Sequence, residues 1–161
     1  MYKRVAIVTF PSQELERPPA APAVLGGLCR HMGIDYTVFD INLQLAKKLT
    51  AEEFAEASDY WRTAHDSLLP QRVFEEFDLT IDSIIAAGYD CVAVSVFSKF
   101  STRAARLFCE RFRPMSPVML VAGGQGLTTP YGNKRFGDWL REQSLVDHVG
   151  WGDGAASLRH L

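Results

Sequence analysis

Short apolar runs alternate along this chain with segments whose apolar residues recur at helical spacing. A short apolar run bounded by glycine, proline or polar residues is typical of a buried strand. The first run, Val5–Phe10, would be apolar on both faces and is therefore expected near the centre of a sheet. We expect five strands in all, at Val5–Phe10, Tyr36–Asp40, Asp90–Phe97, Val118–Ala122 and Val146–Val149.

Helical signals fill the intervals between these strands. The stretch Asn42–Gln71 is less regular, although Thr50 and Glu53 form a capping box that predicts a helix start. Glycines at positions 33 and 88 are expected to end two helices. The other expected helices contain Ala23–Cys29, Val73–Ile85, the segment Ala104–Phe112 capped by Ser98 or Ser101, and Phe136–Leu140.

The alternation of strands and helices predicts an α/β domain spanning residues 1–161. We expect a flavodoxin-like, doubly wound sheet of five parallel strands with helices on both faces. The segment Ala155–Leu161 would begin a last helix that is too short to cover the sheet. We therefore expect the chain to be a module excised from a longer protein.

The composition of the chain limits the classes of partner that we expect it to bind. The chain has 161 residues, 22% of them charged, and a formal net charge of -2. Without a basic stripe we expect no nucleic-acid partner, and without a long apolar run no membrane contact. A cytoplasmic location is the default, because the short amino-terminal run ends at Pro11 and lacks the length of a signal peptide.

Neither cysteine nor histidine spacing predicts a metal site. Cys29, Cys91 and Cys109 are far apart and are expected to be reduced thiols, two of them facing the core. The four histidines lack metal-ligand spacing, and His148 and Asp147, as neighbours in a strand, point to opposite faces. We predict no catalytic residue and no metal ligand in this chain.

The most informative motif is the apolar run Val118–Ala122 followed by Gly123, Gly124 and Gly126. Glycine at the end of a parallel strand lets a ligand lie directly against the backbone. The pattern lacks the spacing of a dinucleotide or phosphate-binding loop. A plain structural turn is the alternative interpretation.

Two hydroxyls stand at the end of the third expected strand, in the motif Ser95-Val96-Phe97-Ser98. At the carboxyl edge of the sheet, such hydroxyls can hydrogen-bond a phosphate or a nitrogen base without burying a charge. Ser98 can instead simply cap the next helix. Beside the glycines, the serines favour a bound tail of an elongated cofactor.

Taken together, these motifs resemble the cobalamin-binding domain at the amino terminus of many radical SAM enzymes. The resemblance covers nearly the whole chain and depends on the order and spacing of the motifs. Those motifs are the proline-rich loop before Ala23–Leu28, the strand end Val38–Asn42, Ser95–Ser98, Val121–Gly124 and the Gly-Trp-Gly-Asp-Gly stretch at 150–154.

The resemblance implies a corrin ring across the carboxyl edge of the sheet and a nucleotide tail descending into the domain. Ser95 and Ser98 would hydrogen-bond the tail, with Val96 and Phe97 in the same motif. The implied remainder of the site is Thr9, Phe10 and Pro11 under the corrin, Gly123, Gly124 and Gly126 leaving room for the tail, and Gly150 and Gly152 along its other side.

The chain departs from the cobalamin domains that supply a cobalt-ligating histidine after the first strand, because Pro11–Glu16 contains none. It also lacks the Cys-x-x-x-Cys-x-x-Cys motif that holds the iron–sulfur cluster of a radical SAM enzyme. The resemblance therefore implies a cofactor-presenting domain. The cluster, S-adenosylmethionine and catalysis of a radical-based methyl transfer would belong to a radical SAM domain downstream in the same protein.

Other functions remain open at this point. The domain could have lost cobalamin and serve as a docking or substrate-recognition module, which the missing histidine favours. A flavin-binding flavodoxin-like domain would need a hydroxyl-rich phosphate loop after the first strand, and Pro11 interrupts that segment. A phosphoacceptor receiver is disfavoured, because no acidic pair follows the first strand and no aspartate follows the third.

Overall fold

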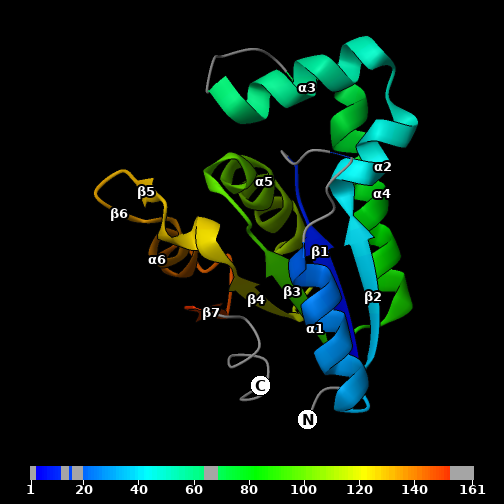
Figure 1. Ribbon diagram of the computed structural model, residues 1–161, viewed down its shortest axis with the longest axis vertical. Helices are drawn as coiled ribbons and strands as arrows, with labels where there is room; N and C mark the ends of the chain where they lie inside the picture. The colour runs from blue at the N-terminus through cyan, green and yellow to red at the C-terminus, as the bar shows by residue number, and fades with distance from the viewer. Residues whose placement is uncertain (1–2, 12–14, 16–19, 64–68, 153–161) are drawn as a thin grey trace.

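A five-stranded, all-parallel sheet forms the centre of the protein, as the computed structural model shows (Figure 1). The structure describes residues 3–11, 15, 20–63 and 69–152. The strand order β2-β1-β3-β4-β7 is that of a flavodoxin-like, doubly wound sheet, so the predicted fold class is confirmed. The strands are β1 (Arg4–Thr9), β2 (Asp35–Asp40), β3 (Cys91–Ser95), β4 (Met119–Gly123) and β7 (His148–Gly150).

Helices lie on both faces of the sheet. Helix α1 (Ala20–His31) covers one face, over β1 and β2 (Figure 1). The opposite face packs against α4 (Gln71–Ala87), α5 (Thr102–Phe112) and α6 (Phe136–Glu142). The remaining elements are α2 (Ile41–Lys48), α3 (Ala51–Thr63), the 3₁₀ turns η1 (Lys99–Ser101) and η2 (Gln125–Thr128), and a small hairpin of β5 (Pro130–Tyr131) and β6 (Lys134–Arg135).

Residues of successive strands alternate between two cores of unequal size. Val5, Ile7, Cys91 and Val121 point to the α1 side and form a small core with Cys29. Their strand neighbours point to the other side and meet the aromatic residues of α4 and α5. Both faces of β1 and β3 are therefore buried, which explains why these strands lie inside the sheet and why their sequences are apolar throughout.

Close packing of α1 depends on a glycine. A Cβ atom at Gly26 would lie 2.5 Å from the ring of Tyr36 on β2, so a larger residue would require that ring to move. Gly33 then ends the helix in the left-handed region, with a φ of 70°, and Gly88 does the same for α4 with a φ of 66°. The predicted helix ends at both glycines are confirmed.

The segment expected to be irregular and helical, residues 42–72, contains most of α2 and all of α3 in its described part. Asp40 caps α2 by accepting a hydrogen bond from the Leu43 N–H at 3.0 Å. The predicted capping box starts α3: Thr50 Oγ1 accepts from the Glu53 N–H at 3.2 Å, and Glu53 accepts from the Thr50 N–H at 2.8 Å. The apolar spacing was weak because each helix buries only two or three residues.

Helix α3 lies across the upper end of the molecule, beyond the carboxyl ends of the strands (Figure 1). Its position is fixed partly by Arg103 of α5, which donates a hydrogen bond to the Tyr60 carbonyl at 3.0 Å and stacks over the Tyr60 ring. Phe54 and Trp61 pack into the core that α3 shares with α4. No helix within the described residues is long and apolar enough to cross a membrane.

Two aspartates hold strands together at the opposite, amino-terminal edge. Asp90 accepts hydrogen bonds from the Lys3 and Arg4 N–H groups at 2.8 and 2.9 Å, and these bonds lower its pKa. Burial raises the pKa of Asp147, but hydrogen bonds from the Leu120 N–H and Arg113 outweigh burial, so its pKa also lies below the usual range. Asp147 thus links β4 to the segment that enters β7.

Replacing Asp147 with alanine should destabilise the fold by about 1–2 kcal/mol, the range for losing hydrogen bonds to a partly exposed carboxylate. A carboxylate whose pKa is depressed by folding stabilises the protein fully above its unfolded pKa, near 4, and loses that contribution as the pH falls through the folded pKa. The stability of the native chain should therefore fall more steeply below pH of about 4 than that of the Asp147→Ala variant.

Urea unfolding followed by circular dichroism over a pH series measures both quantities. Asp35→Ala is the matched control, because the Asp35 side chain is 71% exposed and its ion pair with Arg4 is long, at 3.4 Å. Such an exposed pair contributes little to stability. Equal effects of the two substitutions would contradict the assigned role of Asp147.

Candidate functional site at the carboxyl edge

The carboxyl ends of four adjacent strands meet in a single row. Thr9 pairs with Ser95, Ser95 with Gly123, and Gly123 with Gly150, each in parallel register. Because side chains alternate along each strand, Thr9 and Ser95 point to the α1 side, like Ile7 and Ala93 two residues earlier. The sheet thus presents two hydroxyls and two glycines to one side of one edge, a combination the sequence predicted only in part.

An unpartnered hydroxyl and an open space lie along this row. Thr9 is 1% exposed, and its Oγ1 atom is buried without a hydrogen-bond partner among the described residues. Ser95 is also buried. A Cβ atom built on Gly123 would meet no atom of the described residues within 4 Å, so these residues leave the space beside this glycine open. Among the described helices, α1 is the one on this face, and it lies over β1 and β2 (Figure 1).

The other two glycines of the cluster face the protein itself. A Cβ atom at Gly124 would lie 2.4 Å from the Val96 carbonyl oxygen, and Gly124 has a φ of 107°. A Cβ atom at Gly126 would lie 2.7 Å from the Ser98 carbonyl oxygen, and the Gly126 N–H donates to the Val96 carbonyl at 2.9 Å. The room beside these glycines is therefore filled by the loop after β3, as in the structural-turn interpretation.

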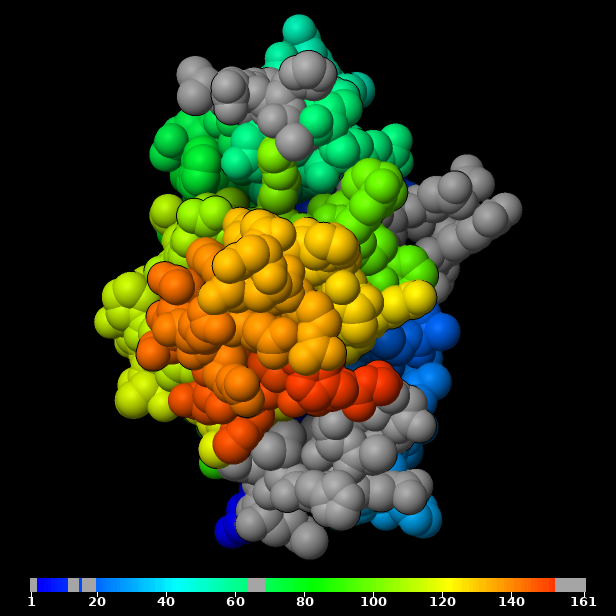
Figure 2. Space-filling view, turned by 90° about the vertical axis from the view of Figure 1, so that its left-hand side faces the viewer, coloured from blue at the N-terminus to red at the C-terminus, as the bar shows by residue number. Residues whose placement is uncertain are grey.

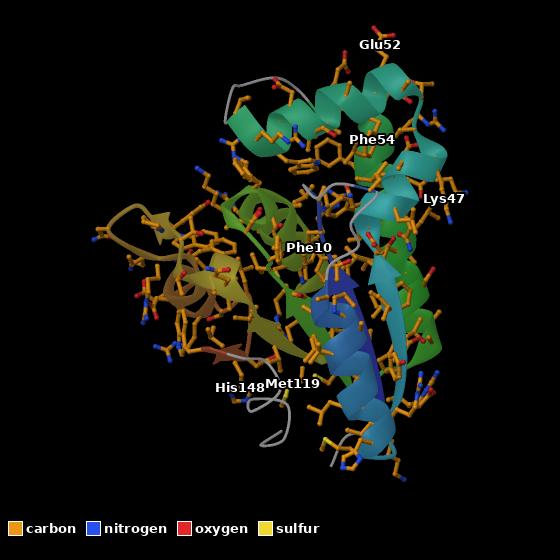
Figure 3. All side chains as sticks on the ribbon, viewed as in Figure 1. Phe10, Lys47, Glu52, Phe54, Met119 and His148 are labelled. Carbon is orange, nitrogen blue, oxygen red and sulfur yellow. The ribbon has the colours of Figure 1, made fainter. Side chains whose placement is uncertain are left out.

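The side chains predicted to lie under a corrin ring are those of Thr9, Phe10 and Pro11, and all three are buried. Phe10 is fully buried and stacks edge-on against Phe108 with ring centroids 5.6 Å apart. In Figure 3 it lies at the upper end of β1, between the sheet and α5. Pro11 and Val96 are buried as well. Phe10 and Val96 point into the core opposite α1, so their side chains support the edge from behind.

Ser98 caps the 3₁₀ turn η1, one of the two alternatives that the sequence left open. Its Oγ atom accepts a hydrogen bond from the Phe100 N–H at 3.2 Å and lies 3.5 Å from the Ser101 Oγ atom. Ser95 and Ser98 therefore differ in surroundings: Ser95 belongs to the row on the α1 side, whereas Ser98 is engaged by the turn that follows.

Three large apolar side chains stand exposed around the same edge. Phe97 is 51% exposed, Leu43 43% and Trp151 39%. Phe97 lies two residues after β3 and Trp151 one residue after β7, whereas Leu43 lies in α2, three residues after the end of β2. Of these, sequence reasoning singled out only Phe97. Leu43 and Trp151 could have been found from their position shortly after a predicted strand, because an apolar residue there no longer belongs to the core of the sheet. Gly152 follows Trp151 with a φ of 86°.

Sulfur and nitrogen ligands are not gathered at this edge. All three cysteines are buried, one more than expected, and burial raises the pKa values of Cys91 and Cys109 to about 12. His148 and Met119 lie toward the other end of their strands (Figure 3). Within the described residues, no cluster of three potential ligands could hold a metal ion. Expected features at 12–14 and 153–161 lie outside the described residues.

No protein-family model matches this chain, and no curated protein is significantly similar to it.

Substitutions at neighbouring glycines should separate the open space from the filled one. Gly124→Ala should destabilise the fold by about 1–3 kcal/mol, because it places a Cβ at positive φ against the Val96 backbone. Gly123→Ala should leave stability unchanged or raise it by about 0.5 kcal/mol, since its Cβ enters open space and alanine restricts the unfolded chain. Thermal unfolding of the two variants beside the native chain measures the difference. Equal losses at both positions would show that the space beside Gly123 is occupied.

Proposed function

We propose that this chain binds cobalamin, with the nucleotide tail in the slot beside Thr9, Ser95 and Gly123, and presents it to a radical SAM domain for radical-based methyl transfer. This proposed slot would lie at the carboxyl edge of a parallel sheet, the usual ligand position in this architecture. The sequence resemblance motivates the choice of ligand, and the open space beside Gly123 supports a ligand that lies against the β4 backbone.

The observation that carries the proposal is the buried, unpartnered Oγ1 atom of Thr9 in the same row as the open space at Gly123. A buried hydroxyl without a partner costs about 1–3 kcal/mol, so native proteins rarely retain one without a reason. An acceptor atom of a ligand in the slot would satisfy this hydroxyl. Gly123 would allow that ligand to touch the backbone of β4.

The chemistry of the row would suit the aromatic base and the phosphate of the cobalamin tail, both of which hydroxyls can hydrogen-bond. From β1 to β7 the row contains hydroxyls and glycines with no charged side chain, and Ala93 and Val121 form an apolar layer one pleat deeper. The segment 11–16 offers no histidine for cobalt. Bound cobalamin would supply the cobalt-centred methyl-transfer chemistry, which lies beyond the reach of protein side chains.

The protein's own residues would bind and orient. Thr9 and Ser95 would fix the depth and rotation of the tail by hydrogen bonds, and Gly123 would admit it. Phe97 and Trp151, exposed at the edge, would cover apolar parts of the ring and exclude water. Phe10 and Val96 would keep the edge rigid from the opposite core.

Gly123→Val should abolish cobalamin retention, because the branched side chain fills the open space. The protein is incubated with hydroxocobalamin, desalted and examined by its visible spectrum, with circular dichroism to confirm the fold. Gly27→Val is the matched control, since Gly27 also faces open space but lies on the exposed surface of α1. Retention should persist in the control.

Thr9→Val tests the hydroxyl itself. Removing a hydrogen bond to the ligand should weaken cobalamin binding by about tenfold, while the free protein should melt at the same or a higher temperature because a buried unpartnered hydroxyl is gone. Titration with hydroxocobalamin and thermal unfolding provide the two readouts. A native chain that retains no corrin absorbance would sink the proposal and favour a docking module, and retained flavin would favour a flavodoxin-like function.

A further inference from the structure

Strand β2 leaves one long edge of the sheet open. It pairs with β1, and no strand of the described residues pairs with its other side (Figure 1). The Asp35 N–H donates to the Lys3 carbonyl, toward β1, at 2.9 Å. Because peptide groups alternate along a strand, Thr37 and Phe39 also face β1, and the N–H and C=O groups of Tyr36 and Val38 face outward.

This edge carries none of the usual features that prevent strand pairing. Its four central residues, Tyr36-Thr37-Val38-Phe39, favour strands and include no proline, glycine or lysine. Its register with β1 runs without a bulge over six pairs. The two carboxylates stand at its ends, where Asp35 pairs with Arg4 and Asp40 caps α2.

We propose that β2 pairs with β2 of a second copy of this chain, antiparallel, about a two-fold axis through Thr37. A two-fold axis perpendicular to the sheet keeps the α1 helices of both subunits on the same side. Residues that lie opposite each other must then point to the same face of the joined sheet, so an even-numbered residue of β2 can lie opposite only an even-numbered one. The outward-facing groups of Tyr36 and Val38 satisfy this condition. Tyr36 lies opposite Val38 of the partner subunit, and Val38 opposite the partner's Tyr36.

Self-complementarity is the reason to choose a second copy over an unrelated peptide. In this register, Tyr36 and Val38 of each subunit each contribute one outward N–H and one outward C=O group. Each of the two residue pairs then exchanges two backbone hydrogen bonds, so that four form in all. On the α1 side, an aromatic ring meets a β-branched side chain in both pairs, a favourable cross-strand combination. Asp35 and Asp40 remain outside the two paired positions, so no like charges face each other there. Val38, 39% exposed in one copy, becomes covered.

The mass of the full chain in solution tests the pairing. Size-exclusion chromatography with light scattering over a concentration series should show twice the 18.0 kDa of one chain at the high end. Val38→Lys should return the protein to a monomer, because it places a charge at the centre of the interface. Val24→Lys is the matched control: Val24 is 59% exposed on α1, and the dimer should persist.

Val38→Pro gives a second, backbone-specific test. Proline removes the outward N–H while leaving the β1 hydrogen bonds to Thr37 and Phe39 in place, so it should also abolish the dimer. Amide exchange adds a residue-level readout, since the Tyr36 and Val38 amides should become protected as concentration rises. A native chain that is monomeric at every concentration, or a dimer that survives in the folded Val38→Lys variant, overturns the proposal. Val38 pairs with Ile7 and is not a member of the Thr9–Gly123 row, so cobalamin retention should be unchanged in the Val38 variants.

Discussion

Parallel pairing in strict register is the constraint on which this structure depends. It brings residues 9, 95, 123 and 150, far apart in the sequence, to one line across the carboxyl edge. The same pairing sends alternate side chains to opposite cores. A shift of one position along the strand would therefore move a hydroxyl to the other face of the sheet. Thr9 and Ser95 share the α1 side for this reason, and Phe10 and Val96 share the aromatic core on the other.

The three glycines of the cluster have different roles, because their surroundings differ. Gly124 and Gly126 let the loop after β4 lie directly on the backbone of Val96, which locks the two loops together. Gly123, one residue earlier, faces open space. The turn interpretation therefore holds for Gly124 and Gly126, and the proposed ligand contact concerns Gly123 alone. The edge combines two glycines packed against a neighbouring loop with one that has space beside it.

Charged and aromatic contacts between distant segments fix the two ends of the sheet. At the amino edge, Asp90 and Asp147 satisfy strand N–H groups that the sheet leaves unpaired. At the carboxyl edge, Arg103 anchors α3 through the Tyr60 carbonyl and ring. The outer edge of β2 has no strand partner among the described residues, and outward-facing backbone groups on an edge strand favour pairing with another strand.

The pattern of apolar residues alone determined the α/β class, the five strands, the central position of β1, and the helix ends at Gly33 and Gly88. These follow from local periodicity and backbone preference, which a sequence contains directly. It also placed Ser95 and the glycines at strand ends. Only the tertiary structure decided that Gly123 has space beside it while Gly124 does not, which of its two alternatives Ser98 adopts, and that a separate helix, α2, precedes the predicted start of α3. Those outcomes depend on which segments meet in space. Hydrophobic periodicity indicates which residues are buried, but it does not indicate which segment they pack against.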